Sequence, residues 1–455
     1  MPKVDLQKAA SLTEEVIRDY HAIIARDRTM ALDGVAEMQE RMRLRGISYG
    51  DRVLCPFLRP FFLSRAEYGY VRDVVKSLKP AFDLVVNRAL ADARWLDWLG
   101  LSDLEKQFFR YEPGFKAASA TSRLDSFLTP TSFKFVEYNA ECPTGIGYGD
   151  VLAEIFSALP TFKEFRKHRK IAHVQALPAL LATLVAAYRQ WGGRNKPNIA
   201  IVDWEDVPTR TEFEIVAEFF DRRGYRTIIC DPRHLELRNK KLYRGDFRID
   251  LVYRRVLVDE FLEKLGECIP MAEAYRSGRV CVVNSFRTKV LHKKAIFAAL
   301  HEDEFLDAMK PETRQAVLEH IPWTRKVADQ RVKLNGRQIE LLAYIEGNRR
   351  KLVLKPNDDY GGRGVVIGWE TEQDAWNQHI RKAMDGGYIV QQRVDVRKEP
   401  FPDIRENLRL KEMIVDMDPF IFSGRGVVGC LTRLSAGSLC NVTSGGGQVP
   451  TFVVG

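Results

Sequence analysis

Four polar side chains interrupt two apolar, strand-like runs in the stretch SRLDSFLTPTSFKFVEYNAECPTG. Residues two apart share one face of a β-strand, so Arg123 and Asp125 project together on the first run. On the second run, Glu137 and Asn139 do the same. If the runs form a hairpin centred on Thr131, one register stacks all four side chains on a single face, with opposed groups about 5 Å apart.

This set of side chains is suited to holding a metal ion. In the predicted register Asp125 faces Glu137, and two carboxylates that close repel each other unless a cation lies between them or one is protonated. With the neutral oxygen of Asn139 they offer the hard oxygen ligands that Mg²⁺ prefers, which substrate phosphates usually complete. The alternative is a solvated sheet face with a cross-strand salt bridge. The spacing alone leaves both interpretations open.

A lysine followed by a glycine-rich loop forms a second candidate site, in KLVLKPNDDYGGRGVVIGW. A predicted strand carries Lys355 and stops at Pro356, and YGGRG follows at residues 360–364. Glycines let backbone N–H groups approach phosphate oxygens closely, and the lysine supplies a point charge. The loop is not a Walker A motif, because GxxxxGK[ST] occurs nowhere in the chain. Taken alone, such a loop is also typical of an ordinary hairpin turn.

Other common site motifs are missing from the sequence. It contains no HExxH, no GxSxG and no HRD or DFG triplet, and its seven cysteines form no CxxC pair. Gly424, Gly426 and Gly429 fit the pattern GxGxxG, but the strand-like CLTRL follows instead of the helix that a dinucleotide site requires. We therefore predict a hairpin turn there.

The elements that must position these residues suggest an α/β fold of the α+β kind. The chain has 455 residues, of which 45% are hydrophobic, enough for two or three structural units. The N-terminal part shows apolar spacings of three and four, typical of helices, with Ser11 and Glu14 as a capping box. A strand–helix–strand rhythm begins near Asn198. The expected segments are a helical region at 1–105, a segment with the metal-binding hairpin at 106–190, a small α/β domain at 191–285 and a mixed segment at 286–455.

Charge and apolar patterning limit the classes of partner. The net charge of +9 could favour anions of any kind. The densest basic run, KEFRKHRK at 163–170, has no interleaved aromatic residue beyond Phe165, so we expect a solvated helix face and no nucleic-acid partner. The N-terminus lacks the apolar core of a signal peptide, and the most apolar helical stretch is shorter than the roughly 20 residues that span a bilayer. We expect no membrane segment and a cytoplasmic protein.

Taken together, the two candidate sites resemble the ATP-grasp superfamily, and specifically its circularly permuted members related to glutathionylspermidine synthase. The family pattern R-x-D followed by E-x-N-A-[DE]-x-P-T is similar to RLD at 123–125 and EYNAECPT at 137–144. In ordinary ATP-grasp enzymes the acidic block follows the lysine and the glycine-rich loop, whereas here it precedes them, as in the permuted relatives. The resemblance covers roughly residues 110–455 and implies a Rossmann-like pre-ATP-grasp domain within the 191–285 segment.

The resemblance also implies roles for individual residues. Asp125, Glu137 and Asn139 would hold Mg²⁺, and Arg123 would meet the transferred phosphoryl group. Lys294 is preferred as the first ATP lysine because it lies where a helix begins after a strand, but Lys289 and Lys293 stay open as alternatives. The residues expected to contact ATP are Lys294, Lys355, Tyr360, Gly361, Gly362, Arg363, Gly364, Gln391, Gln392, Val394, Arg433 and Asn441.

The implied activity is an ATP- and Mg²⁺-dependent carboxylate–amine ligase, similar to glutathionylspermidine synthase, that acts through an acyl phosphate and releases ADP. Its partners would be a small-molecule carboxylate and an amine. The helical N-terminal region is too short for the amidase domain of some relatives, so hydrolysis of the product is not expected. The alternative is a catalytically inactive nucleotide-binding protein that acts as a sensor or in assembly.

Overall fold

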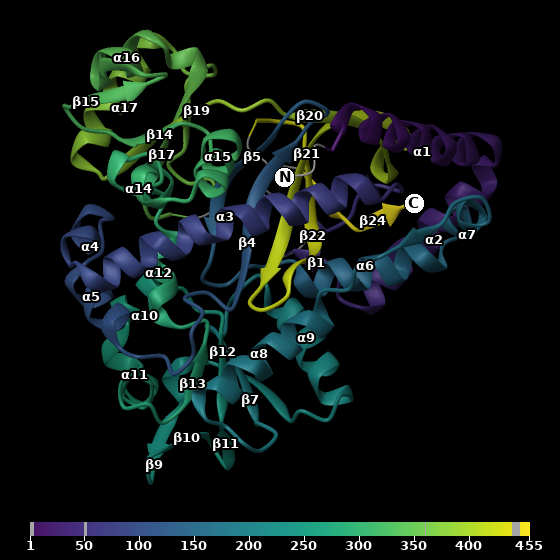
Figure 1. Cartoon of the computed structure of the whole chain (residues 1–455). Coiled ribbons are helices and arrows are strands. Elements are labelled where there is room, and N and C mark those ends of the chain that lie inside the picture. The colour runs from purple at the N-terminus through teal and green to yellow at the C-terminus, as the bar shows by residue number, and fades with distance from the viewer. Residues whose placement is uncertain (1–3, 50–51, 360, 439–445) are drawn as a thin grey trace.

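An antiparallel sheet forms the centre of the molecule. The computed structural model describes the chain except for residues 1–3, 50–51, 360 and 439–445 (Figure 1). The strand order is β23-β22-β21-β4-β5, and β20 also pairs with the long strand β21. The strands are β4 (Thr121–Leu128), β5 (Phe133–Asn139), β20 (Arg397–Asp403), β21 (Arg409–Phe422), β22 (Gly426–Ser435) and β23 (Gly447–Val449), and the short 3-10 helix η5 (Ile404–Glu406) precedes β21.

The hairpin of β4 and β5 has the predicted register at its polar end. Asp125 is paired with Glu137, and Arg123 with Asn139. Beyond Asp125 the pairing shifts by one residue, which leaves Val136 as the extra residue of a bulge. A bulge bends and twists a strand locally. The predicted register is therefore confirmed for the polar pairs and wrong toward the turn.

The N-terminal region packs against the central sheet within one continuous core. The long helix α3 crosses one face of that sheet (Figure 1). It begins at a capping box in which Ser64 and Glu67 each bond the backbone of the other. The elements of this region are α1 (Leu6–Arg26), α2 (Arg28–Leu44), β1 (Ser48–Tyr49), β2 (Arg52–Val53), β3 (Phe61–Ser64), α3 (Arg65–Ala91), α4 (Arg94–Trp98) and α5 (Asp103–Arg110).

The predicted capping box at Ser11 is wrong, because α1 begins earlier. The side chain of Asp5 accepts a hydrogen bond from the backbone N–H of Lys8 and caps the helix there. Ser11 consequently lies inside α1. Aspartate is as good a cap as serine, so two nearby candidates could not be ranked from the sequence.

A second set of helices and a short sheet follow the hairpin. Strand β24 pairs in parallel with β3 and antiparallel with β6, which brings a C-terminal strand beside the N-terminal region. In the basic run around α7, Glu164 pairs with Lys167 at 2.6 Å and with Arg26 at 3.3 Å. The elements are α6 (Ile146–Ala158), α7 (Pro160–Arg166), β6 (Ile171–Ala172), α8 (Leu177–Trp191) and β24 (Thr451–Val454).

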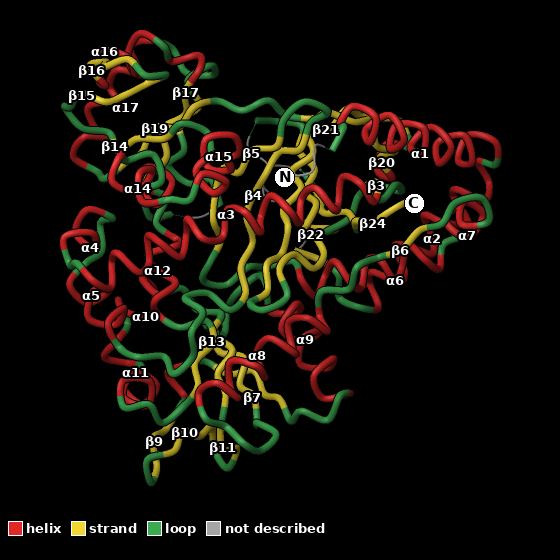
Figure 2. Tube along the Cα trace, viewed as in Figure 1, coloured by secondary structure: helices red, strands yellow, loops and turns green. Residues whose placement is uncertain are grey.

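Residues 199–283 form an α/β unit with its own hydrophobic core. Its parallel sheet has the order β13-β12-β7-β8, and helices flank these strands in Figure 2. The predicted strand–helix–strand unit is present as β7, α9 and β8. The elements are β7 (Ile199–Val202), α9 (Arg210–Arg222), β8 (Thr227–Cys230), η1 (Pro232–His234), β9 (Glu236–Arg238), β10 (Lys241–Arg244), β11 (Phe247–Ile249), β12 (Leu251–Arg254), α10 (Val258–Glu263), η2 (Leu265–Glu267), α11 (Ile269–Arg276) and β13 (Cys281–Val283).

Residues 324–392 form a smaller outer unit, whose four-stranded sheet has the order β14-β19-β17-β18 and a third hydrophobic core. A series of short helices leads to it from the α/β unit. The connecting elements are η3 (Phe286–Thr288), α12 (Lys289–His292), α13 (Ala295–Ala299), α14 (Asp303–Ala308) and α15 (Pro311–His320). The outer unit contains β14 (Thr324–Lys326), β15 (Arg331–Leu334), β16 (Arg337–Glu340), α16 (Leu341–Gly347), η4 (Arg349–Lys351), β17 (Leu352–Pro356), β18 (Val366–Ile367), α17 (Gln373–Asp385) and β19 (Tyr388–Gln392).

Two sequence-based expectations concern the whole chain. Within the described residues, no helix is both long and apolar enough to cross a bilayer. The described cysteines are all free, and most of them are buried. Their thiols serve as small packing groups in the cores rather than as a disulfide framework.

Candidate functional site

A cavity of about 270 Å³ lies between the central sheet and the outer unit. We call it the central cavity. The β4–β5 hairpin and β21 form one wall, and β17, β19 and the glycine-rich loop form the other. The predicted site residues that line it are Arg123, Asp125, Glu137, Asn139, Lys294, Lys355, Gly361, Gly362, Arg363, Gln391, Gln392, Val394 and Arg433.

The remaining predicted site residues lie elsewhere or outside the described part of the chain. Gly364 does not line the cavity and has a φ of 65°. A Cβ atom there would lie 3.1 Å from the hydroxyl of Tyr388 and 3.2 Å from Cγ of Pro356. Gly364 therefore lets the loop fold back closely against β17. Tyr360 and Asn441 lie outside the described residues.

Arg123 and Asp125 form a buried bidentate ion pair at the cavity wall. Nε of Arg123 donates to Oδ1 of Asp125 at 2.7 Å, and Nη2 donates to Oδ2 at 3.1 Å. The remaining Nη1 donates to the carbonyl of Thr144 at 3.1 Å. The Nδ2 amide of Asn139 also donates to Asp125, at 2.9 Å. The predicted polar face is thus assembled, with Asn139 serving Asp125 as a donor.

Two carboxylates that the sequence analysis missed complete this cluster. Asp416 and Asp418 lie on β21, and each offers an oxygen within 4.8 Å of the other and of Asp125. Nη2 of Arg433, on β22, lies 2.5 Å from Asp125, 2.5 Å from Asp416 and 3.1 Å from Asp418. With Arg123 included, three carboxyl groups and two guanidinium groups share this small, mostly buried space.

Burial and mutual charge determine how these carboxyl groups titrate. Burial favours the neutral form of Asp125, but the adjacent Arg123 and Arg433 outweigh it and hold the pKa of Asp125 below its usual range. Burial, reinforced by the charges of Asp125 and Asp416, raises the pKa of Asp418 well above its usual range. Burial also raises the pKa of Asp416. The Asp416 and Asp418 pair therefore retains a proton more readily than exposed aspartates do.

The donor set fits a hard divalent cation such as Mg²⁺. Oδ1 of Asp416 is buried and accepts no hydrogen bond from the described residues, and the buried Oδ2 of Asp418 has only ion-pair contacts, with Arg433 at 3.1 Å and Arg123 at 3.7 Å. A bound cation would satisfy such oxygens and would lower the pKa of both groups. The predicted ligand set was Asp125, Glu137 and Asn139. The geometry adds a second possible set, in which Asp125 acts with the two β21 carboxylates.

The geometry also distinguishes among the three neighbouring lysines that the sequence left as candidates for the first ATP lysine. Of these, Lys294 lines the central cavity, and its Nζ lies 3.4 Å from Oε1 of Glu137. Nζ of Lys293 instead donates to Oδ2 of Asp358 at 2.6 Å. Lys289 is buried outside the cavity wall. Lys294 is therefore the lysine of this group that can reach a ligand in the cavity.

Lys355 is held by the strand next to it. Its Nζ donates to Oε1 of Gln391 at 2.8 Å and to the carbonyl of Val136, the bulge residue, at 3.0 Å. Nε2 of Gln391 in turn donates to the hydroxyl of Thr324 at 3.1 Å, which fixes the amide. Burial lowers the pKa of Lys355 to about 8. The sequence predicted Gln391 as an ATP contact, and its side chain has this additional task of positioning Lys355.

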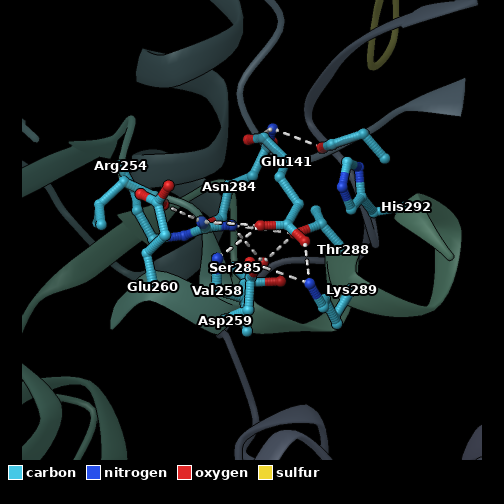
Figure 3. Close-up of polar contacts among 12 residues, drawn as sticks. Glu141, Arg254, Val258, Asp259, Glu260, Asn284, Ser285, Thr288, Lys289 and His292 are labelled. Atoms are coloured by element: carbon cyan, nitrogen blue, oxygen red, sulfur yellow. Dashed lines mark hydrogen bonds and ion pairs between the residues drawn. The ribbon is translucent and has the colours of Figure 1, made fainter. Parts of the chain in front are cut away.

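Lys289 ties four parts of the chain together, and Figure 3 shows it beside Glu141 and Asp259. Its Nζ lies 2.8 Å from Asp358, 3.1 Å from Asp259, and 3.5 Å from both Glu105 and Glu141. Burial alone would lower the pKa of Lys289, but these carboxylates outweigh it and raise that pKa. Because Asp358 follows β17, this cluster anchors the start of the loop that borders the cavity.

Asn284 anchors the open end of the β4–β5 hairpin from the end of β13 (Figure 3). Its Nδ2 donates to the carbonyls of Thr121, Ala140 and Glu141 at 2.7, 3.0 and 2.9 Å. Its Oδ1 accepts from the backbone N–H groups of Ala120 and Thr121. One buried amide therefore holds both strands that carry the polar face. No sequence pattern marked it, since a lone asparagine after a strand usually indicates a turn.

Asp416 and Asp418 did leave a signal in the sequence. They interrupt the apolar run MIVDMDPFIF two residues apart, which is the same alternation that drew attention to Arg123 and Asp125. This alternation could be read from the sequence, but the strand that pairs with β21, which is β4, lies far away in the chain. Only the fold brings the two polar faces together.

The comparisons agree with this architecture. Residues 129–435 match the family described as circularly permuted ATP-grasp type 2. A solved structure of a glutathione synthetase-like effector from Globodera pallida, in its apo form, aligns over 94% of this chain and 98% of its own with a TM-score of 0.58. The sequence identity in that alignment is 13%, so this likeness concerns the fold alone.

Two curated relatives share part of their length with this chain. A Frankia casuarinae protein provisionally named glutamate–cysteine ligase 2-2 is 27% identical over 339 residues, 70% of this chain and 36% of that protein. An uncharacterized protein of Mycobacterium tuberculosis is 26% identical over 348 residues, 71% of this chain and 58% of that protein. The chain spans only those fractions of its relatives. Because the family match extends over residues 129–435, more than half of the sequence, the chain belongs to the circularly permuted ATP-grasp type 2 family.

Proposed function

We propose that this protein is an ADP-forming ligase that uses ATP and Mg²⁺ to join a carboxylate to an amine. One observation carries the proposal: a single cavity is lined by the carboxylates of Asp125, Glu137 and Asp416, together with Arg123, Arg433, Lys294 and Lys355. Among the described residues, no cysteine or histidine lines that cavity. A wall of this kind suits phosphoryl transfer, in which catalysis consists largely of positioning and charge stabilisation.

The proposed reaction has two steps. A carboxylate oxygen of the substrate attacks the γ-phosphorus of ATP, the bond to the bridging oxygen breaks, and ADP leaves. The amine nitrogen then attacks the acyl carbon of the resulting acyl phosphate, phosphate departs with the original carboxylate oxygen, and the amine loses a proton. In this scheme Arg123 and Arg433 stabilise charge on the transferred group, while Lys294 and Lys355 hold the ATP phosphates.

The metal would belong to the carboxylate cluster. Asp125 would hold it together with Glu137 and Asn139, as expected from the sequence, or together with the β21 carboxylates. When bound, Mg²⁺ would neutralise phosphate oxygens. The backbone of the segment from Gln391 to Val394, which leaves the outer unit at the end of β19, would border the adenine.

Product analysis of ATP turnover tests this function. Pools of carboxylates and amines are incubated with the protein, ATP and Mg²⁺, ADP release is measured, and amide products are identified by mass spectrometry. The first pairs are glutamate with cysteine, suggested by the name of the Frankia relative, and glutathione with a polyamine, suggested by the resemblance to glutathionylspermidine synthase. ADP release should require both partners. Turnover of ATP without any new amide across the pools would contradict the proposal.

A second candidate function is nucleotide binding without catalysis, in a sensor or an assembly protein. The observation that favours it is the position of Arg433, whose guanidinium already supplies a cation among the three carboxylates. This candidate predicts ATP binding that Mg²⁺ does not strengthen. Calorimetric titration of ATP with and without Mg²⁺ separates the two functions, because the ligase requires tighter binding of the magnesium complex.

A further inference from the structure

A second cavity, of about 460 Å³, lies on the opposite face of the same hairpin strands. We call it the far-face cavity. Ser122, Leu124 and Tyr138 line it, and they alternate along β4 and β5 with the residues that line the central cavity. Because neighbouring residues of a strand point to opposite faces, the two cavities share strands but no lining side chain. Its volume lies within the range of roughly 300–1,000 Å³ that is typical of small-molecule sites.

The floor of the far-face cavity is apolar. It is formed by buried side chains from α3, from the hairpin, from α12 and from the end of β21. These residues are Val75, Phe82, Leu124, Tyr138, Leu291 and Phe422. The rings of Phe82 and Tyr138 lie side by side, with centroids 4.7 Å apart. An aliphatic or aromatic body would be sheltered from water on this floor, and the burial of its apolar surface would favour binding.

The rim of the cavity is cationic. Arg72, Lys76 and Lys79 extend from exposed positions of α3, and Arg425 extends from the turn between β21 and β22. Lys79 is paired with Asp83 of the same helix. Within the described part of the chain, the side chains of the other three cations form no ion pair. Asp73 is the remaining carboxylate of the rim, so three unpaired cations stand against one unpaired acid.

The glycine pattern of the β21–β22 turn belongs to this rim. Gly424 and Gly426 have φ values of 76° and 74°, and a Cβ atom on either would meet no other atom within 4 Å. The predicted hairpin turn is therefore confirmed, and the turn needs glycine for its backbone conformation rather than for space. The result is a tight turn that carries Arg425 to the mouth of the cavity.

We propose that the far-face cavity is a second ligand site, which binds an organic anion with one carboxylate and an apolar body. The apolar floor takes the body, and Arg72, Lys76 and Arg425 attract the carboxylate. A neutral molecule would leave the rim charges without a partner, and a compact inorganic anion would leave the floor exposed to water. A cation would face the excess positive charge. The proposal is independent of the chemistry in the central cavity.

Calorimetric titration with decanoate tests the proposal, since decanoate has one carboxylate on an apolar chain. The titration is made on the full chain with saturating ATP present, which keeps the probe out of the central cavity. We expect one saturable site for decanoate and at least about tenfold weaker binding of decanol, which corresponds to about 1.4 kcal/mol or more. The double variant Lys76→Glu with Arg425→Glu should also lose at least about tenfold in affinity for decanoate.

The control is Arg381→Glu, which reverses another exposed cation, on α17 and away from both cavities. It should bind decanoate as the unaltered protein does. All three altered positions are solvent-exposed, so the variants should fold, and thermal unfolding checks this. Absence of saturable binding would overturn the proposal. So would equal affinity in the double variant and the control, or a saturable site for decanoate that is found only when ATP is left out.

Discussion

At the scale of residues, the wall of the central cavity contains buried charged side chains that neutralise one another. Asp125 accepts from Arg123, Arg433 and Asn139 at once, so its carboxylate stays ionised despite its burial. Asp418 lies in the same cluster, yet its pKa is raised. The pKa values of neighbouring carboxyl groups in one cluster are thus shifted in opposite directions, a division that is common where charge must be transferred or a metal bound.

Replacing Arg123 by lysine should slow turnover more than it weakens ATP binding. Lysine keeps the charge but cannot present the two parallel donors with which Arg123 holds Asp125. We expect kcat to fall by about 10²-fold, the usual effect of losing one donor that stabilises a transition state, with little change in the dissociation constant of ATP. Steady-state kinetics and calorimetry measure the two quantities.

The matched control is Arg59→Lys. Arg59 is fully buried and pairs with Glu399 at 2.7 Å, outside the central cavity. This variant should lose stability but keep its turnover per folded molecule. An unchanged kcat in the Arg123 variant would remove that residue from the proposed mechanism.

Replacing Asp418 by asparagine should weaken metal binding without destabilising the fold. The raised pKa means that this carboxyl is readily protonated when no cation is near, and an amide resembles that neutral form. The melting temperature without metal should therefore stay the same or rise. The Mg²⁺ concentration for half-maximal activity should increase at least about tenfold, since even indirect partners of a metal have effects of that size. Asp33→Asn, an exposed change on α2, serves as the control. An unaltered Mg²⁺ requirement would exclude Asp418 from the metal site.

The lowered pKa of Lys355 predicts a pH dependence of ATP binding. Since burial lowers this pKa to about 8, the lysine loses its proton as the pH rises above that value, and its attraction for phosphate weakens. ATP binding near about pH 8.5 should take up a proton, because phosphate raises the lysine pKa again. Calorimetry in two buffers with different ionisation enthalpies measures this uptake. Lys355→Arg, which stays charged, should abolish it. Equal proton uptake in both proteins would assign it to another group.

The same pKa shift has a consequence for stability. An unfolded lysine titrates near its ordinary pKa of 10.5, so between about pH 8 and that value the unfolded chain binds more protons than the folded one. The contribution of Lys355 to the free energy of unfolding therefore rises with pH across this window. Below the window it opposes folding, because the lysine is then charged and buried.

At the scale of elements, two buried polar residues hold the site in place. Asn284 fixes the open end of the hairpin, and Lys289 joins α5, the end of β5, α10 and the loop after β17. Neither residue lines the central cavity. Their contacts are the reason that a hairpin and a loop from distant parts of the chain meet in a fixed geometry.

Replacing Lys289 by methionine should strongly destabilise the fold. The change leaves Glu105, Glu141, Asp259 and Asp358 close together without their shared cation. We expect the free energy of unfolding to fall by about 3–5 kcal/mol, the usual cost of breaking a buried charge network. Urea unfolding measures it. Lys310→Met, at an exposed position, should change the same quantity by no more than about 0.5 kcal/mol. Equal effects of the two changes would contradict this role for Lys289.

Local patterns predicted the parts of the site that one or two elements determine. Alternation along β4 and β5 gave the pairing of Asp125 with Glu137, because a strand fixes which residues share a face. The bulge at Val136 was not predictable in this way, since it depends on how the hairpin packs. The helix expected to begin at Lys294 is the short α13, which begins at Ala295, and the capping box expected at Ser11 lies inside α1. Boundaries of this kind depend on tertiary contacts that periodicity does not contain.

At the scale of the whole molecule, the central sheet separates two cavities. The central cavity opens toward the outer unit, and the far-face cavity lies under α3. The sheet itself is built from β4 and β5 together with the C-terminal strands β21 and β22. The fold class was predictable because the order of the acidic block and the lysine loop is a property of the sequence. The meeting of Asp125 with Asp416 and Arg433 was not, since it requires strand pairing across most of the chain.

The transfer of isotopic oxygen tests the central claim most directly. A carboxylate substrate found by the product screen is labelled with ¹⁸O in its carboxyl group, and the phosphate released during amide formation is analysed by mass spectrometry. An acyl-phosphate ligase transfers one carboxylate oxygen to phosphate, so each phosphate formed should carry one ¹⁸O atom. Phosphate without label would show that the carboxylate never attacked ATP, and would contradict the function proposed for this cavity.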